Sequence, residues 1–243
     1  MPLTAIGFDA DDTLWQNEAF FQITQARFAA LLADAADPDH LAARLEAAER
    51  RNLGRYGFGI KGFVLSMIET AIEVTDERVS AGVIRELIEA GQEMLAHPIH
   101  LLDGARETIE ALAGEVRLIL ITKGDLLDQE RKLAQSGLGD LFDAVEIVSD
   151  KTRATYEAAF ALHGTGPAAA MMVGNSLQAD VIPALAAGAW GVHVPHPLTW
   201  GYERADPPVR EARLAQSESL RELPDLIAGL RWARATFPPQ SRM

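Results

Sequence analysis

The sequence contains no cysteine among its 243 residues. Disulfide bonds and thiol chemistry are therefore excluded, which fits a reducing compartment. Long hydrophobic runs are also missing, since no apolar stretch approaches the roughly 18 residues of a membrane span. The N-terminus lacks the basic segment and apolar core of a signal peptide. We therefore expect a cytoplasmic protein that does not interact with membranes.

Positive charge is scarce. The 22 lysines and arginines are outnumbered by 35 aspartates and glutamates, so the formal net charge is −13 at pH 7. This charge argues against nucleic acid or an anionic membrane as a partner. It does not exclude a small anion, because a local site can be positive inside an acidic protein. Lysine is especially rare, with four in the chain, so Lys151 just after a predicted strand indicates a specific role.

Hydrophobic residues make up 48% of the chain and charged residues 23%, as in ordinary globular proteins. An apolar run begins at Ala5, and after residue 98 further apolar runs alternate with helical patterns. The later runs predicted as strands are residues 116–121, 144–148, 169–173 and 190–194. Alternating strands and helices imply a parallel sheet with right-handed crossovers. The prediction is an α/β protein with a Rossmann-like parallel sheet of five or more strands flanked by helices.

A helical insert interrupts this alternation directly after the first strand. Helical periodicity continues for about eighty residues after Leu14, in four predicted helices. The predicted boundaries give an α/β core from residues 1–14 and 98–243, and a helical domain from residues 15–97. A glycine-rich loop is predicted between two of the inserted helices, at residues 54–62.

Polar side chains follow four of the predicted strands. The first strand ends in the run Asp9-Ala10-Asp11-Asp12-Thr13. The other ends carry Thr122, Lys151, and Asn175 with Asp180. In open α/β sheets ligands bind beyond the carboxyl ends of the strands, where such side chains converge. Neighbouring carboxylates resist joint ionisation, and a divalent cation with its preference for oxygen ligands would relieve this repulsion.

These motifs, in this order, resemble those of the haloacid dehalogenase (HAD) superfamily along the whole chain. The run from Asp9 to Thr13 resembles its first motif, Thr122 the second and Lys151 the third. Residues 174–180, Gly-Asn-Ser-Leu-Gln-Ala-Asp, resemble the fourth motif. The chain departs from the pattern at Asn175, where the family often has aspartate. The resemblance implies that the insert is a small helical (C1-type) cap that closes over the site and excludes water and bulky substrates.

The resemblance also implies a phosphatase, that is, a phosphoric monoester hydrolase, acting on a small phosphorylated metabolite. Asp9 would attack phosphorus and form an aspartyl-phosphate. Asp11 would protonate the leaving alkoxide and then deprotonate the water that cleaves the intermediate. Thr122 would donate its hydroxyl, and Lys151 its charge, to the phosphoryl oxygens.

The cofactor implied is Mg²⁺, held by Asp9, the backbone carbonyl of Asp11, Asn175 and Asp180. An amide oxygen binds Mg²⁺ less strongly than a carboxylate oxygen, so either Asp180 or Asn175 could be the closer ligand. The sequence leaves both arrangements open.

Three basic residues are further candidates for substrate binding. Lys123 directly follows Thr122. Arg55 and Lys61 lie in the glycine-rich loop of the insert, which the resemblance places at the active site when the cap closes. We expect this loop to contact the part of the substrate remote from phosphate.

Four alternative functions remain compatible with the sequence. A 2-haloacid dehalogenase is disfavoured by Asp11, because a halide leaving group needs no acid and that reaction needs no metal. A phosphonate hydrolase similar to phosphonoacetaldehyde hydrolase would form a Schiff base, for which Lys61 is the one lysine of the insert. A phosphomutase needs the same two aspartates. A non-catalytic binding module built on a decayed enzyme is the alternative outside the enzymes.

Overall fold

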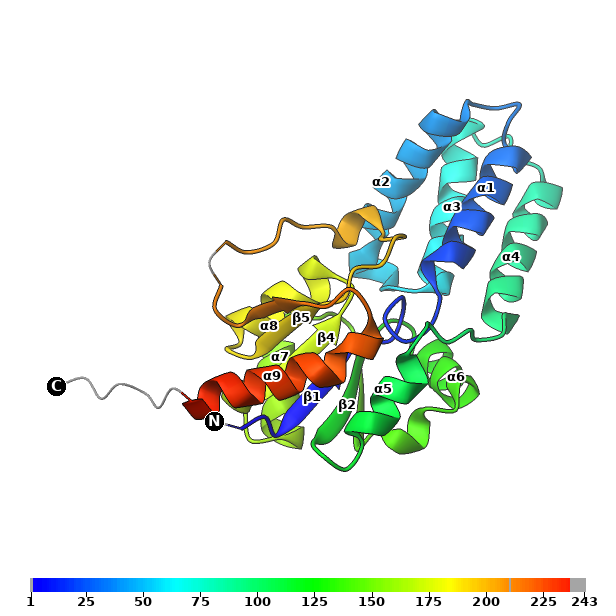
Figure 1. Ribbon diagram of the computed structural model, residues 1–243. Coiled ribbons are helices and arrows are strands. Elements are labelled where there is room, and N and C mark those ends of the chain that lie inside the picture. Colours follow the sequence, from blue (N-terminus) through cyan, green and yellow to red (C-terminus); the bar gives the residue numbers. More distant parts are fainter. Residues whose placement is uncertain (1, 210, 237–243) are drawn as a thin grey trace. The chain divides into compact units, whose positions relative to one another are not determined.

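The computed structural model describes residues 2–209 and 211–236. Within them the chain divides into two compact units, which are described separately (Figure 1). The sheet unit contains the described residues of Met1–Gln16, His100–Thr122 and Ser136–Met243. The helical unit contains Asn17–Ile99 and Lys123–Gln135. The second unit therefore includes a segment that follows the sheet unit's Thr122 in the chain.

The sheet unit is built on a six-stranded sheet within the described residues, with the strand order β3-β2-β1-β4-β5-β6. The strands are β1 (Ala5–Phe8), β2 (Arg117–Lys123), β3 (Ala144–Val148), β4 (Ala170–Gly174), β5 (Trp190–His193) and β6 (Leu214–Gln216). The pairs β1–β2, β1–β4, β4–β5 and β5–β6 are parallel. The predicted Rossmann-like parallel sheet is confirmed. The sequence did not indicate β6, because three partly exposed residues are too few for a periodic pattern.

Helices cover both faces of this sheet. They are α5 (Ala105–Leu112), α7 (Arg153–His163), α8 (Ile182–Ala186) and α9 (Leu223–Thr236). Tyr156 and Phe160 of α7 and Ala184 of α8 pack in one apolar cluster with the strand residues Ile119 and Met172. In Figure 1, α5 and α9 lie in front of the strands, on the other face. The four central strands β2, β1, β4 and β5 are mostly buried, as expected for parallel strands covered on both faces.

The strand register brings the polar strand ends to one edge. Phe8 of β1 aligns with Leu120 of β2 on one side and with Val173 of β4 on the other. One residue beyond Phe8, the Asp9 N–H still donates to the Val173 carbonyl, at 2.9 Å. The residues that follow these strands therefore begin at the same level of the sheet.

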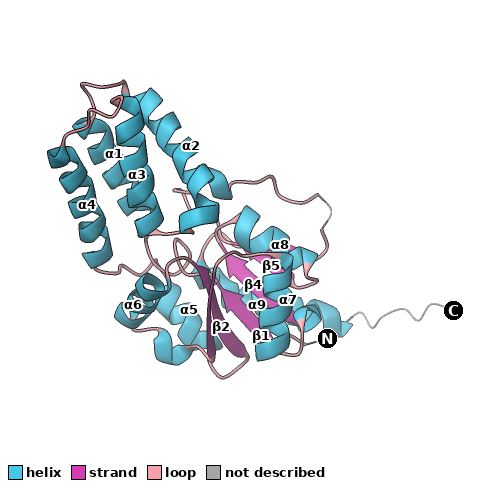
Figure 2. Cartoon of the chain, turned by 180° about the vertical axis from the view of Figure 1, so that it is seen from behind, coloured by secondary structure: helices cyan, strands magenta, loops and turns pink. Residues whose placement is uncertain are grey.

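The helical unit is a bundle in which successive helices pack side by side (Figure 2). Its helices are α1 (Glu18–Leu31), α2 (Pro38–Tyr56), α3 (Ile60–Val74), α4 (Ala81–Ala96) and most of α6 (Leu126–Ser136). The four inserted helices were predicted, and each contributes to one buried core, for example Phe28, Leu45, Met67 and Leu87. Asp37 caps α2 through a 2.9 Å hydrogen bond from the His40 N–H, which fixes where that helix begins.

The loop between α2 and α3 is shorter than the sequence predicted. The prediction of a glycine-rich loop over residues 54–62 is wrong in extent, because α2 continues to Tyr56 and α3 begins at Ile60. Arg55 lies in the last turn of α2 and Lys61 in the first turn of α3. Isolated glycines are tolerated within helices, so Gly54 and Gly62 did not end either one.

Side-chain contacts explain why the segment after Thr122 groups with the helical bundle. Lys132 Nζ donates to Asn17 Oδ1 at 2.8 Å, and Arg131 donates to the His97 carbonyl at 3.2 Å. Asn17 precedes the first of the four inserted helices and His97 follows the last, so α6 contacts the chain both where the insert begins and where it ends. The assignment of the two units to a catalytic core and a cap stays a prediction.

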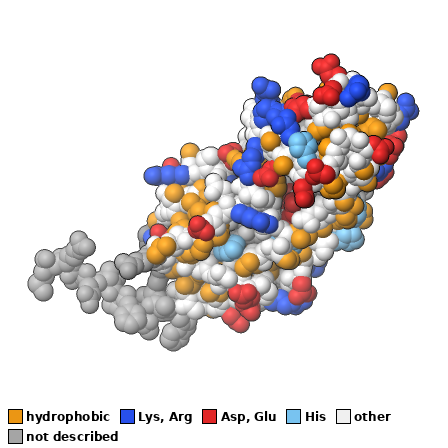
Figure 3. Space-filling view, turned by 90° about the horizontal axis from the view of Figure 1, so that it is seen from above, with side chains coloured by type: hydrophobic (Ala, Val, Ile, Leu, Met, Phe, Trp, Pro, Cys, Tyr) orange, Lys and Arg blue, Asp and Glu red, His pale blue; other side chains and the backbone are white. Residues whose placement is uncertain are grey.

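The surface of the bundle carries charges of both signs. Acidic and basic side chains lie among apolar ones on the face that Figure 3 shows. Arg44 and Arg51 of α2 pair with Glu73 of α3 at 2.5 and 3.0 Å. Exposed pairs of this kind contribute little to stability. No helix among the described residues has the length and hydropathy needed to cross a membrane.

Among the described residues of the four inserted helices, one carboxyl group is buried. Glu49 of α2 is 9% exposed. Burial first, and then the charges of Glu18 and Glu46, raise its pKa to about 8. The unfolded chain would ionise this group near its ordinary value of 4.5. The folded protein therefore holds a proton that the unfolded chain has lost between about pH 4.5 and 8.

Glu49→Gln should change the pH dependence of stability. A raised pKa in the folded state means that the free energy of unfolding falls as pH increases from about 5 to 8. The variant lacks this titration, so it should equal the wild type near pH 4.5 and be the more stable of the two at pH 9. Urea unfolding followed by circular dichroism at both pH values measures this. If the difference in the free energy of unfolding between the variant and the wild type does not grow with pH, Glu49 is not a buried, neutral carboxyl group.

Candidate active site

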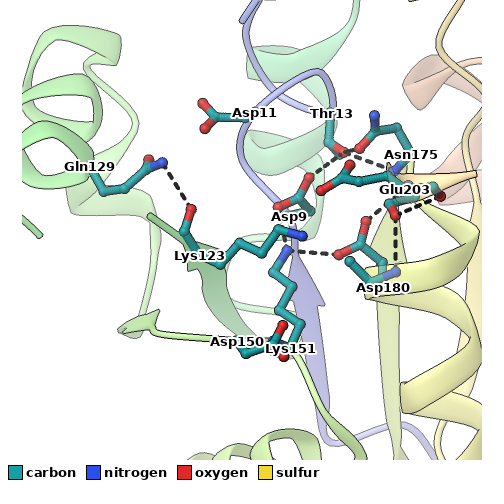
Figure 4. Close-up of polar contacts among 12 residues, drawn as sticks. Asp9, Asp11, Thr13, Lys123, Gln129, Asp150, Lys151, Asn175, Asp180 and Glu203 are labelled. Atoms are coloured by element: carbon teal, nitrogen blue, oxygen red, sulfur yellow. Dashed lines mark hydrogen bonds and ion pairs between the residues drawn. The ribbon is translucent and has the colours of Figure 1, made fainter. Parts of the chain in front are cut away.

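The site is centred on the ammonium group of Lys151. This side chain follows β3 and is 5% exposed. Its Nζ donates hydrogen bonds to Asp9 Oδ1 and, at 2.7 Å, to Asp180 Oδ1 (Figure 4). One buried cation thus joins the ends of β1 and β3 to the turn after β4. The sequence placed these three residues at one edge of the sheet, and the structure brings them into contact.

Asp180 is held from several directions. The N–H of Ser176 donates to its Oδ2 at 3.0 Å. The Tyr156 hydroxyl donates to the Ala179 carbonyl at 3.0 Å and lies 3.5 Å from Asp180 Oδ1. A Cβ at Gly174 would lie 2.2 Å from Asp180 Oδ2, so only glycine fits there. Both Asp180 oxygens therefore accept hydrogen bonds within the protein.

The hydroxyl of Thr13 joins Asp9 to Asn175. Its Oγ1 accepts from the Asn175 N–H at 3.0 Å, and it can donate to Asp9 Oδ2, 3.1 Å away, or to Asn175 Oδ1, 3.2 Å away. A hydroxyl has one proton to donate. A carboxylate oxygen and an amide oxygen thus converge on a single donor.

The electrostatics of this cluster are unusual for aspartate and lysine. Burial, and then the charge of Asp180, raise the pKa of Asp9 to about 7, while Lys151 opposes the shift and Glu203 adds slightly to it. Burial disfavours the charged form of Lys151, but the charges of Asp180 and Asp9 outweigh it and raise the lysine pKa. The ammonium group therefore stays charged, and its charge compensates those of the two buried carboxylates.

Asp11 occupies a tight turn two residues beyond Asp9. Its Oδ1 accepts a 2.7 Å hydrogen bond from Trp15 Nε1, and Trp15 is fully buried. The turn closes through the Ala10 carbonyl, which accepts from the Leu14 N–H at 2.8 Å, and Asp12 adopts φ 59°. Figure 4 shows the Asp11 carboxylate turned away from the Lys151 cluster. The hydrogen bond from the buried tryptophan therefore holds the Asp11 carboxylate in this direction.

Thr122 and Lys123, also predicted as site residues, belong to different units of the structure. Thr122 is buried in β2, and within the described residues no side-chain hydrogen bond links it to Lys151 or Asp9. Lys123 belongs to the helical unit, where its Nζ lies 4.1 Å from the centre of the Phe58 ring.

The two candidates from the insert also lie in the helical unit. Arg55 is exposed. Lys61 Nζ donates to both oxygens of Asp125 at 3.0 and 2.9 Å. That ion pair ties the start of α3 to the segment that follows Lys123, and it engages the nitrogen that a Schiff base would use.

The donor atoms around Thr13 fit a hard divalent cation. Asp9 Oδ2 and Asn175 Oδ1 share one hydroxyl proton, so acceptor capacity remains on both, and Mg²⁺ prefers such oxygens. Among the described residues no three His, Cys, Asp or Glu side chains form a cluster that could hold a metal by themselves. Mg²⁺ does not require one, since it usually binds through one or two carboxylates, substrate oxygens and water.

Three residues of this region were not singled out from the sequence. Thr13 lies within the first motif but has a common helix-capping explanation. Tyr156 belongs to the apolar face of α7, so its hydroxyl contact gives no separate signal. Glu203 belongs to the loop after β5, and only the folded chain shows it beside Asn175 (Figure 4).

Lys151→Met should destabilise the protein strongly. The substitution leaves Asp9 and Asp180 buried without their cation, and breaking a buried pair costs about 3–5 kcal/mol. The loss of unfolding free energy should be smaller at pH 5. Lys151 lowers the pKa of Asp9, so this pKa rises further in the variant, and the carboxyl group takes up a proton at pH 5. Urea unfolding at pH 8 and pH 5 measures both effects.

The matched control is Lys61→Met, which removes an exposed lysine and should cost less than about 1 kcal/mol. Equal losses for the two variants, or a Lys151→Met loss independent of pH, would contradict the buried ion triad.

Comparisons with known proteins identify the family of this chain. The sequence profile of the haloacid dehalogenase-like hydrolases matches residues 3–188. No protein with curated function matches the sequence. Among solved structures, a haloacid dehalogenase-like family hydrolase from Xanthomonas campestris is 40% identical, with 95% of this chain and 93% of that one covered and a TM-score of 0.84.

Two more distant structures share the fold. YfnB from Bacillus subtilis, described as a HAD hydrolase bound to magnesium, is 17% identical over 93% of this chain and 99% of that one, with a TM-score of 0.63. L-2-haloacid dehalogenase from Xanthobacter autotrophicus is 18% identical over 94% and 99%, with a TM-score of 0.65. The family match and the 40% identity, together with the Asp9–Lys151–Asp180 triad, show that the chain belongs to the haloacid dehalogenase-like hydrolases.

Proposed function

We propose that this hydrolase is a Mg²⁺-dependent phosphatase of small phosphorylated metabolites that acts through an aspartyl-phosphate on Asp9. The site is built from oxygen donors and one cation, which suits a phosphoryl group and a hard metal. The net charge of −13 disfavours nucleic acid and anionic membranes as partners. A cytoplasmic location and the cap role of the helical unit belong to the same proposal.

The observation that carries the proposal is the fixed carboxylate of Asp11. Its 2.7 Å hydrogen bond from Trp15 holds it turned away from the Lys151 cluster, which includes Asp9. In phosphoryl transfer the attacking and leaving oxygens lie roughly in line on opposite sides of phosphorus. An acid for the leaving oxygen therefore cannot lie beside the nucleophile. An alkoxide leaving group needs that acid, whereas a halide does not.

The proposed reaction has two steps. An oxygen of Asp9 attacks phosphorus, the ester P–O bond breaks, and the leaving oxygen takes a proton from Asp11. Asp11 then removes a proton from water, whose oxygen attacks the aspartyl-phosphate, and inorganic phosphate leaves with Asp9 restored. Mg²⁺, held by Asp9, the Asp11 carbonyl and Asn175, would supply stabilisation of the charge that develops on the phosphoryl oxygens.

Neighbouring residues keep the nucleophile in place. Lys151 orients Asp9 and offers charge to a phosphoryl oxygen, and Asp180 fixes Lys151. Asp180 is fully buried and its oxygens accept hydrogen bonds from Lys151 and the Ser176 N–H, so we place it behind the residues that would hold the metal. Thr122 contributes its hydroxyl at the end of β2. Lys123, Arg55 and Lys61 stay candidates for contacts with the rest of the substrate.

The protein should release inorganic phosphate from at least one member of a panel of small phosphate monoesters when Mg²⁺ is present. EDTA should abolish the release and added Mg²⁺ should restore it. Asp9→Asn should remove turnover without unfolding the protein, because the nearly isosteric amide is no nucleophile. A malachite green assay measures the phosphate.

Each competing function predicts a different result in the same assay series. Chloride release from 2-chloropropionate in EDTA, without phosphate release, would identify a dehalogenase. Borohydride trapping of an aldehyde at Lys61 would identify a phosphonate hydrolase, although Asp125 engages that lysine in the structure. Isomerised phosphate esters without free phosphate would identify a phosphomutase. Ligand binding with no turnover would identify a binding module.

Asp11→Asn should slow the enzyme by about 10²–10⁴-fold on alkyl phosphates, because it removes the general acid. The loss should be much smaller on p-nitrophenyl phosphate, whose leaving group needs little protonation. The ratio of kcat/KM values on the two substrate types, compared with the wild type, measures this. Equal losses on both types would show that Asp11 is not the acid.

A further inference from the structure

The loop between β5 and β6 has no role in the proposed function, yet it is fastened to the site. Val194, at its start, donates its N–H to the Gly174 carbonyl at 3.0 Å. His193 Nε2 lies 3.0 Å from the Asn175 carbonyl. Ser176 Oγ donates to the Glu203 carbonyl at 3.3 Å, in the short helical turn Gly201–Glu203. These three contacts hold the end of β5 and the loop after it against the end of β4 and the turn that follows.

These contacts direct one side chain of the loop into the site. Figure 4 shows the Glu203 side chain extending toward Asp9 and Asn175. Its carboxylate therefore adds negative charge on this side of the site.

The charges on the metal side of the site leave a deficit. Lys151 carries one positive charge against the two carboxylates of Asp9 and Asp180, so these three side chains keep a single net negative charge. The oxygens around Thr13 then provide one carboxylate, from Asp9, and one neutral amide, from Asn175. These two side chains therefore offer a divalent cation one formal negative charge.

We propose that Glu203 supplies a second negative charge to the divalent cation, in place of the carboxylate that Asn175 lacks. This inference rests on the proposed function, in which that cation is Mg²⁺. Since no three acidic or histidine side chains of the described residues form a metal-holding cluster, Glu203 acts through water. Mg²⁺ keeps several waters when it binds proteins, and a carboxylate hydrogen-bonded to such a water strengthens binding. Glu203 is thus a positioning residue for the cation.

The test is Mg²⁺ binding measured by isothermal titration calorimetry, without substrate. Glu203→Gln should raise the Kd about tenfold, in the range typical for residues behind metal ligands. The control is Glu115→Gln, which removes an equal charge from an exposed residue just before β2, at the opposite ends of the strands. It should leave the Kd unchanged.

A second variant separates charge from loop structure. Asn175→Asp in the Glu203→Gln background returns one carboxylate, so the Kd should come back to within about threefold of the wild type. A Kd that Glu203→Gln does not change, or a loss that Asn175→Asp does not repair, would overturn the role of Glu203 and leave the phosphatase proposal standing. A wild type that binds no Mg²⁺ would overturn both.

Discussion

A single buried ammonium group holds the catalytic region together. Lys151 lies between Asp9 and Asp180, and these three side chains come from the ends of β1, β3 and the turn after β4. Removing two carboxylates from water is costly unless an opposite charge compensates, and here one lysine serves both. The parallel register, the glycine at 174 and the Tyr156 hydroxyl all act to keep that geometry.

The sequence predicted which residues lie at the strand ends of this site, but not the side-chain contacts between them. Strand ends are predictable, because alternating apolar runs define parallel strands and their carboxyl ends share one edge. Asp9, Lys151, Asn175 and Asp180 were therefore expected together. Contacts that need actual distances were not predictable. The double role of the Thr13 hydroxyl follows from oxygens 3.1 and 3.2 Å away, which no spacing in the sequence reveals.

The helical unit shows the same limit. Apolar periodicity predicted its four inserted helices, because each buries one face in a common core. It did not predict that the segment after Thr122 would pack with them, since that depends on individual polar pairs such as Lys132 with Asn17. The Lys61–Asp125 pair is a further case, because two exposed charges far apart in sequence carry no periodic signal.

Asn175 changes how the family's site can work in this chain. An aspartate there would bring its charge from within the motif, next to the strand that positions it. In the proposed magnesium site, a neutral amide leaves Asp9 as the main anionic oxygen, while Lys151 reduces even that charge. The remaining negative potential must then come from outside the motifs. In our proposal the loop after β5 meets this need, because the Glu203 carbonyl accepts a hydrogen bond from Ser176, in the same turn that carries Asn175. If Glu203 acts as we propose, cation affinity depends on two segments of the chain rather than on one.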